Sequence, residues 1–345
     1  MDIRVGIIGF GRIGAKHAEW LSRAKDIHGA AVFDCTPERR ELAKSRELRA
    51  VDTIDAILGD SSIDAVLVST TTSMHSNDAS KALAARKHVM VEKPVALTYP
   101  EAEQLAALSR SAGRTLSVFQ NRRWDIDFLT VKSAIEAGTF GRVFNVESRL
   151  GQWASCVGRA AKEWRPNWRN ESAFGGGGLY DWGSHLVDQM LLLMQPATPK
   201  TVFAQLLANV WSSDPNCDDF ARVCINFDGG ANGGAIGLVE INTTTTRPLP
   251  RWHIDGERGS AESPFSLSFD KTQWAKLNFT PEPSGDEHLI AHAQPGLSET
   301  QIWERFAAAC RGESEPAVTI ESVLPTMRVL DAARESSRTG SAVSM

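Results

Sequence analysis

The stretch Arg4-Val-Gly-Ile-Ile-Gly9-Phe-Gly11-Arg-Ile-Gly14 decides how the first half of this chain folds. Residues 4–8 form a short apolar strand, the next six read G-x-G-x-x-G, and residues 15–21 have helical spacing. The glycines allow a tight turn and a close approach of the backbone to a pyrophosphate, which the helix N-terminus would hold. A strand, this glycine triplet and a helix, in that order, therefore predict a dinucleotide site.

A second strand, 30–33, ends in Asp34, which lies 20 residues after Gly14. This is where the ribose-binding acid of a dinucleotide site belongs. Because a carboxylate there accepts ribose hydroxyls and repels a 2′-phosphate, the sequence favours NAD, with NADP as the weaker candidate. Arg39 and Arg40 could restore NADP binding, although both fit the start of a solvated helix better.

Strands and helices keep alternating up to about residue 120. The expected elements are helix 52–58, strand Ala65–Val68, a helix ending near residue 85, strand His88–Val91, helix Tyr99–Ala112 and strand Thr115–Phe119. Short strands with intervening helices predict an α/β fold with a parallel, doubly wound sheet. Ser69, Thr70 and Thr71 follow a strand, where their hydroxyls would line a cofactor cleft. His75 fits this cleft and a solvent-facing helix start equally well.

The tripeptide Glu92-Lys93-Pro94 ends the apolar strand His88–Val91. Pro94 cannot donate to a sheet and biases Lys93 towards an extended conformation, so the chain turns away and leaves Lys93 at the rim. Taken alone, the tripeptide is equally consistent with a surface lysine beside a glutamate. The tripeptide lies beyond the carboxyl end of a buried strand, where open α/β sheets bind their ligands, and this favours a functional role for Lys93.

From about residue 123 the pattern changes. An amphipathic helix, 125–137, precedes β-rich stretches that predict a large, mainly antiparallel, open-faced sheet. These stretches are Arg142–Trp153, Thr201–Trp211, Asp219–Asp228, Ala235–Thr246 and Trp252–Glu262, and two helices near 298–310 and 320–337 close the chain. We expect a domain at 1–122 and a second at 123–345, packed around one cleft. The sheet is too broad for the few helices to cover both faces, so an uncovered apolar face would form a subunit interface.

A run of four glycines, Gly175–Gly178, precedes a helix that begins near Leu179. Asp181, His185 and Asp188 fall at i, i+4 and i+7 and share one face of that helix. A lone histidine on a helix is usually structural, whereas an Asp–His pair behind such a run better fits an oriented acid/base. We expect Asp181 to favour the protonated imidazole.

Four of the ten tryptophans, Trp153, Trp164, Trp168 and Trp182, lie close together in sequence with Arg159, Arg165 and Arg169. Aromatic faces and arginines suit a polyhydroxylated ring, although about half of these tryptophans could serve packing alone. The expected substrate contacts are Arg123, Trp153, Trp168, Arg169 and Trp182.

The composition argues against several classes of protein. The chain has 345 residues, of which 42% are hydrophobic and 23% charged, as in globular proteins of about two domains. A net charge of −5 does not indicate binding to nucleic acid or to an anionic membrane. Five scattered cysteines without a C-x-x-C indicate a reducing compartment and no metal site. With no leader-like start and no apolar run near ~18 residues, we expect a cytoplasmic protein.

The glycine triplet, Glu92-Lys93-Pro94 and Asp181-x-x-x-His185, in this order, resemble the Gfo/Idh/MocA oxidoreductase family. The resemblance covers nearly the whole chain and is thin from about residue 200 to 300. It implies a Rossmann domain, then an α/β domain whose open sheet makes a homodimer or homotetramer, with a final helix that returns to the first domain. It also implies that Lys93 and His185 flank the reacting carbon of the substrate, with Asp181 as their partner.

The resemblance implies NAD-dependent oxidation of a secondary hydroxyl on a sugar, inositol or related polyol, with His185 as general base and Lys93 stabilising alkoxide character. The residues expected at the cofactor are Gly9, Phe10, Gly11, Arg12, Ile13, Gly14, Asp34, Ser69, Thr70, Thr71, His75, Glu92, Lys93 and Gln120. Two alternatives stay open: glycoside cleavage through transient oxidation and elimination, and a non-catalytic sensor on the same fold. The presence of Lys93, Asp181 and His185 argues against the sensor.

Overall fold

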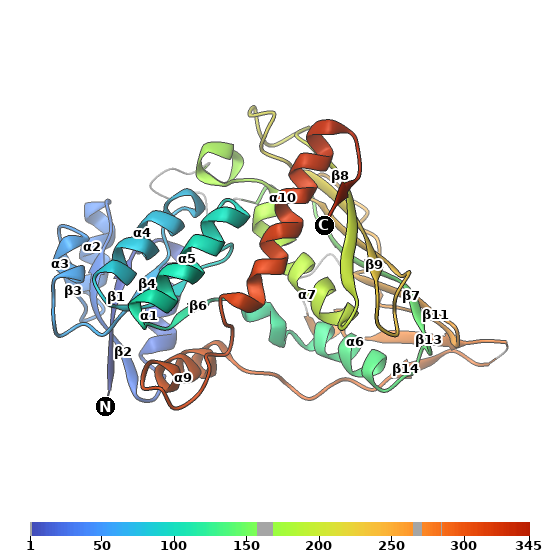
Figure 1. The fold of residues 1–345 in the computed structure, drawn as a ribbon, viewed down its shortest axis with the longest axis horizontal. Helices are drawn as coiled ribbons and strands as arrows, with labels where there is room; N and C mark the ends of the chain where they lie inside the picture. Colours follow the sequence, from blue (N-terminus) through green and yellow to red (C-terminus); the bar gives the residue numbers. More distant parts are fainter. Residues whose placement is uncertain (1, 157–167, 265–270, 284) are drawn as a thin grey trace.

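The structure is a computed structural model that describes residues 2–156, 168–264, 271–283 and 285–345. Two sheets form the centres of two units, and helix α10 (Leu324–Thr339) runs between these units (Figure 1). Within the described ranges, no helix is long and apolar enough to cross a membrane.

The first unit is a six-stranded parallel sheet in the order β3-β2-β1-β4-β5-β6, which confirms the predicted doubly wound sheet. Its elements are β1 Ile3–Ile8, α1 Arg12–Leu21, β2 Ile27–Phe33, α2 Pro37–Lys44, β3 Arg49–Val51, α3 Asp55–Leu58, β4 Ala65–Val68, α4 Thr72–Ala84, β5 His88–Val91, α5 Tyr99–Ala112 and β6 Leu116–Val118. Strand β4 is buried along its whole length, as expected for a parallel strand covered on both faces. The strand order reverses between β1 and β4, so a ligand crevice opens beyond their carboxyl ends.

The edge strand β3 differs from the prediction. Its three residues are exposed or only half-buried and show no apolar run, so the sequence does not reveal it. The helix expected over 52–58 begins only at Asp55, because the chain first completes β3 and a turn.

The second unit is a nine-stranded sheet in the order β14-β13-β12-β11-β7-β10-β9-β8-β15. Its strands are β7 Val143–Gly151, β8 Thr198–Leu207, β9 Phe220–Asp228, β10 Ile236–Asn242, β11 Trp252–Gly256, β12 Gly259–Glu262, β13 Leu277–Pro281, β14 His288–Ile290 and β15 Val343–Ser344. Only β7 and β10 pair in parallel among these described strands, so the predicted mainly antiparallel sheet is confirmed.

The strands differ in their bounds from the predicted β-rich stretches, most clearly in two places. Strand β8 ends at Leu207 because the backbone N–H groups of residues 209–211 turn to the carboxylate of Asp219, at 2.6–3.1 Å. The stretch 252–262 is a hairpin, β11 and β12, rather than one strand. Short strands β13 to β15 have too few residues to show a period in the sequence.

Helices near the second unit and the chain end position the site. Helix α7 (Ser184–Met194) packs on the inner face of the large sheet, and α6 (Ile126–Glu136) packs against α7 and against α8 (Lys271–Trp274). Helix α10 contacts β8, α7 and α5, so it touches both units (Figure 1). Helix α9 (Glu299–Cys310) packs on the first unit, although it lies within the range 123–345.

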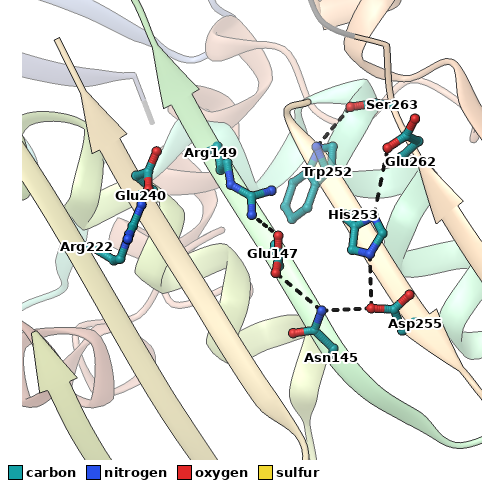
Figure 2. A network of polar contacts seen from close by, with 10 residues as sticks. All are labelled: Asn145, Glu147, Arg149, Arg222, Glu240, Trp252, His253, Asp255, Glu262 and Ser263. Carbon is teal, nitrogen blue, oxygen red and sulfur yellow. Dashed lines mark hydrogen bonds and ion pairs between the residues drawn. The ribbon is translucent and has the colours of Figure 1, made fainter. Parts of the chain in front are cut away.

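The outer face of the large sheet is not the apolar surface expected from the sequence. Figure 2 shows a network of charged and polar side chains across β7, β9, β10 and β11. Arg149 pairs with Glu147, Arg222 with Glu240 at 2.9 Å through Nε, and His253 with Asp255 at 3.0 Å. Exposed apolar side chains, Phe203, Leu207 and Ile236, lie on neighbouring strands. The face is therefore mixed, with charges that are already paired.

Candidate active site

One cavity of about 1040 Å³ lies between the two units and is lined by residues of both. The first unit contributes the chain beyond the carboxyl ends of β1, β4 and β5. The second unit contributes residues 152–156 and part of 168–185. The structure thus brings the three sequence motifs to one place.

The glycine loop has the close backbone contacts that a dinucleotide site needs. Gly9 has a φ of +92°, and a Cβ placed on it would lie 2.6 Å from Ser69 O. A Cβ on Gly14 would lie 2.1 Å from Gly9 O, so neither position accepts a side chain. The cavity is lined here by Gly9, Gly11, Arg12 and Ile13, at the start of α1, which fits a pyrophosphate. Phe10 and Gly14 do not line it; the ring of Phe10 is packed in the core.

Asp34 lies at the end of β2, on the wall of the cavity. Its Oδ2 accepts from Phe10 N at 2.6 Å and its Oδ1 from Thr36 N at 2.8 Å, so the carboxylate is held rigidly beside the glycine loop. Arg39 lines the cavity and its Nη1 lies 3.5 Å from Asp34 Oδ2. Arg40 instead donates to the backbone oxygen of Asp34 at 2.7 Å. Of these two arginines, Arg39 is the one that lines the cavity beside Asp34.

The residues after β4 connect the loops around the cavity. Ser69 Oγ donates to Gly9 O at 2.8 Å, which fixes β4 against the glycine loop. The ring nitrogens of His75 lie 2.8 Å from Pro94 O and 3.3 Å from Thr70 O. Burial lowers the pKa of His75, and both ring nitrogens face backbone carbonyls. His75 therefore joins the loops after β4 and β5 rather than facing solvent. Ser69, Thr70, Thr71 and His75 all line the cavity.

Glu92 is held by a chain of hydrogen bonds that begins on α9. Trp303 Nε1 donates to His17 Nδ1 at 3.1 Å, so the proton of His17 is on Nε2, which donates to Glu92 Oε1 at 2.7 Å. Burial would raise the pKa of Glu92, but the bond from His17 and the charge of Lys93 outweigh it and lower the pKa. Glu92 thus stays ionised, and its Oε2 accepts from Lys93 N at 3.1 Å.

Lys93 meets the second unit at Asp181. Its Nζ donates to Asp181 O at 2.7 Å and to Asp181 Oδ1 at 3.2 Å, and the two side chains are 16% and 24% exposed. Burial would raise the pKa of Asp181, but Lys93 and then Arg169 lower it. The lysine at the rim of the first sheet is therefore fixed by the helix region that carries His185.

His185 is oriented by Gln120. The Nε2 of Gln120 donates to Ser184 O at 3.2 Å, which leaves its Oε1 to accept from His185 Nδ1 at 2.7 Å. His185 Nδ1 therefore carries the proton and Nε2 has the lone pair. The described residues provide no hydrogen-bond partner for Nε2, and the ring lines the cavity. Gln120 itself does not line the cavity, so its observed contact is with His185.

The expectation that Asp181 favours the protonated ring of His185 is wrong. Asp181 binds Lys93, and burial lowers the pKa of His185 well below its usual value, with the positive charges of Lys93 and Arg122 acting in the same direction. The imidazole is therefore neutral at physiological pH.

Arg123 and Asp188 lie away from the cavity. Arg123 donates to both carboxylate oxygens of Asp188 at 2.7 Å, and Thr326 Oγ1 donates to the same carboxylate at 3.1 Å. This buried pair joins the chain after β6 to α7 and α10. The expected substrate contact Arg123 is thus a structural residue, and its neighbour Arg122, missed from the sequence, lines the cavity instead.

The three tryptophans expected to contact the substrate, Trp153, Trp168 and Trp182, line the cavity. The guanidinium of Arg122 lies 4.2 Å from the centre of the Trp182 ring, and that of Arg169 lies 4.2 Å from the Trp168 ring. Trp153 also lines the cavity and is 53% exposed. Trp164, Arg159 and Arg165 lie outside the described residues.

Asp218 supports the helix region of Asp181 and has no signal in the sequence. Its Oδ2 accepts from Leu179 N at 2.8 Å, at the start of the π-helical turn Leu179–Gly183 that leads into α7. A Cβ on Gly177 would lie 2.4 Å from Asp218 Oδ1, so the glycine run is needed for this contact. Burial raises the pKa of Asp218 to about 7. Among the described residues, no group of three His, Cys, Asp or Glu side chains could hold a metal ion.

Comparisons with known proteins agree with this arrangement. A family model for the NAD-binding Rossmann fold of an oxidoreductase family matches residues 3–120, and one for the GFO/IDH/MocA C-terminal domain matches residues 128–262. The scyllo-inositol 2-dehydrogenase (NADP(+)) of Bacillus subtilis is 32% identical over 351 residues, 97% of this chain and 94% of that protein.

An uncharacterized oxidoreductase of Schizosaccharomyces pombe is 34% identical over 236 residues, 66% of this chain and 62% of that protein. The match spans a similar share, 60% and 58%, of two further curated oxidoreductases. A solved structure of an NAD-binding protein from Listeria innocua superposes with a TM-score of 0.87 at 29% identity, over 100% of this chain and 97% of that one.

Proposed function

This chain belongs to the Gfo/Idh/MocA family of oxidoreductases, and on that basis we propose that it transfers hydride between a secondary hydroxyl of a sugar, inositol or related polyol and NAD. The observation that carries the proposal is the meeting of Lys93, Asp181 and His185 in the cavity that also contains the glycine loop. The name of the Bacillus subtilis relative supports an inositol-like substrate.

In this proposal the reacting hydroxyl lies between Lys93 Nζ and His185 Nε2. His185 accepts the hydroxyl proton, because its Nδ1–H is bound to Gln120 and the lone pair of Nε2 is available. Lys93 donates a hydrogen bond to the same oxygen and stabilises the negative charge that develops there. Asp181 holds Lys93 in position through two contacts from the opposite unit.

The backbone of the glycine loop and the start of α1 would hold the cofactor pyrophosphate, and Asp34 the adenosine ribose. Bound NAD supplies the hydride acceptor. We propose NAD rather than NADP because the Asp34 carboxylate is fixed at the cavity wall, where it repels a 2′-phosphate. Arg39 beside it is the residue that would favour the phosphate.

A substrate panel of inositols, aldoses and glycosides tests the proposal, with NADH absorbance and product masses recorded together. Net NADH supports the dehydrogenase. Cleavage of a glycoside without net NADH would instead indicate elimination after transient oxidation. Binding without turnover would indicate a non-catalytic sensor.

Variants of the two polar residues test the mechanism. Lys93→Met and His185→Asn should each lower kcat by roughly 10²–10⁴, the usual effect of removing a positioned acid or base. Lys81→Met, an exposed lysine on α4, is the matched control and should keep wild-type turnover. Near-wild-type turnover in either active-site variant would remove that residue from the mechanism.

A further inference from the structure

The charges that line the second-unit side of the cavity do not balance. The described residues that line this side of the cavity include one carboxylate, Asp181, and two arginines: Arg169, and Arg122 from the chain just after β6. Lys93, which belongs to the first unit, forms an ion pair with Asp181. His185 adds no charge, because its pKa is lowered by burial and by these cations. Lys93, Arg122 and Arg169 face two carboxylates, Asp181 and the ionised Glu92, so this part of the described wall has one positive charge in excess.

Arg122 is partly neutralised within the protein. Its Nη1 pairs with Asp125 at 2.8 Å, but the same carboxylate also pairs with Lys271. Two cations thus share one carboxylate. The face of the Arg122 guanidinium lies over Trp182, which fixes its plane at the cavity wall.

Among the described carboxylates, none pairs with Arg169. No Asp or Glu in the described part of the chain lies within ion-pair distance of its guanidinium, and it stacks over Trp168 at 4.2 Å. Burial raises the pKa of Asp181, whereas the charge of Lys93 and, less strongly, that of Arg169 lower it. The guanidinium of Arg169 is therefore close enough to Asp181 to act on it.

The backbone of Arg169 is fixed by the glycine run. Its carbonyl oxygen accepts from Gly177 N at 2.9 Å, and a Cβ on Gly176 would lie 2.4 Å from the same oxygen. The close approach that these glycines permit therefore places Arg169 against the cavity. A guanidinium that is stacked on an aromatic ring, on a fixed backbone, and that pairs with no described carboxylate is prepared to bind an anion through two parallel hydrogen bonds.

We infer that the substrate is an anionic polyol, a sugar or cyclitol acid whose carboxylate pairs with Arg169 while a neighbouring secondary hydroxyl reaches Lys93 and His185. This inference deepens the proposed function and rests on it for the identity of the reacting hydroxyl. Arg122 adds to the local positive potential but keeps its own partner.

Calorimetric titration of the protein–NADH complex tests the carboxylate without requiring turnover. Glucuronate, galacturonate and gluconate are compared with the neutral methyl ester of each uronate and with glucose, and glucose 6-phosphate serves as the phosphate probe. At least one acid should bind about 10- to 100-fold more tightly than its neutral counterpart, the scale of a charge-assisted pair.

The variant Arg169→Gln should remove this preference while leaving the affinity for the neutral ligand unchanged. Arg338→Gln, at a guanidinium that is 71% exposed on α10, is the matched control and should keep the preference. Equal binding of acid and ester, binding of none of the acids, tighter binding of the phosphate, or equal weakening of acid and ester by Arg169→Gln would each overturn the inference.

NADH formation with the same panel separates the two proposals. Acids that bind through Arg169 but yield no NADH would refute the dehydrogenase and leave the carboxylate site standing. NADH formed from neutral polyols alone would refute the carboxylate site and leave the dehydrogenase standing.

Discussion

Replacing Gln120 with glutamate tests how His185 is set up as a base. In the wild type a neutral amide oxygen accepts from His185 Nδ1 at 2.7 Å, and the pKa of His185 lies well below 6.5 because of burial and nearby cations. Gln120→Glu places a negative charge at the same atom. Since an ionised acceptor stabilises the imidazolium, the variant should raise the pKa of His185.

The size of this effect follows from the contact distance. Two unit charges about 4 Å apart interact by roughly 4 kcal/mol at an effective dielectric of ~20, equivalent to about 3 pKa units. Burial of the new carboxylate and loss of the amide bond to Ser184 O, 3.2 Å in the wild type, reduce this value. We therefore expect the pKa of His185 to rise by roughly 1–3 units.

Protonated His185 cannot accept the hydroxyl proton, so the change is visible in the pH dependence of kcat/KM. The wild type should lose no activity through His185 between about pH 6.5 and 8, because the pKa lies below that range. In Gln120→Glu the acidic limb should move up by roughly 1–3 pH units. The variant should therefore lose activity at the acidic end of the profile and regain it as the pH rises.

Two further variants serve as controls for Gln120→Glu. Gln120→Leu removes the acceptor, so activity should fall at every pH without a shift of the acidic limb. Gln301→Glu, in the capping box of α9, should leave the profile unchanged. If Gln120→Glu is folded and its acidic limb coincides with that of the wild type, Gln120 does not control the protonation of His185.

Three other expectations follow from the structure. NAD should bind more tightly than NADP, because the Asp34 carboxylate repels the 2′-phosphate, and Asp34→Ala should reduce this difference in affinity. Calorimetry that shows equal or tighter binding of NADP to the wild type would contradict this expectation. We propose that the chain forms a homodimer or homotetramer through the outer face of the large sheet, where the exposed Leu207 lies near paired charges. Light scattering should then give a molar mass that is a multiple of 37.6 kDa, and Leu207→Glu should lower that mass. A wild-type protein that is monomeric at micromolar concentration would rule the interface out. The folded-state pKa of Asp218 is raised from 3.8 to about 7, so the native state binds the extra proton between these values and stability falls as pH rises through that window. Asp218→Asn keeps an acceptor for Leu179 N, so its Tm relative to the wild type should increase from pH 6 to pH 8; a difference that does not change with pH would refute the burial argument.

The sequence predicts those parts of the site whose signal is local. The glycine triplet and the acid at residue 34 have fixed spacing within one βαβ unit, and Glu92-Lys93-Pro94 ends an apolar run, so each is visible without the fold. Arg122 and Arg123 are indistinguishable in sequence. Which of them faces the cavity depends on Asp188, 65 residues after Arg123, and only the packed structure shows this.

Partners that are distant in sequence explain the other differences. Gln120 orients His185 across 65 residues, and Asp218 supports Leu179 across 39. Neither contact leaves a periodic or compositional trace. The outer face of the sheet was expected to be apolar because of its breadth. Its alternate residues instead carry charges that pair across neighbouring strands, as Arg222 and Glu240 do, or along one strand, as His253 and Asp255 do.

The packing of α9 on the first unit affects the order in which the protein is completed during synthesis. Ile302, Trp303 and Phe306 are part of the same apolar core as β1, and Trp303 begins the hydrogen-bond chain that ends at Glu92. The ribosome must therefore translate nearly the whole chain before the first domain can bury its last face. A chimera that joins residues 1–122 to the second half of another family member would place a foreign helix on that core. Recombination between relatives must therefore transfer α9 together with the first domain.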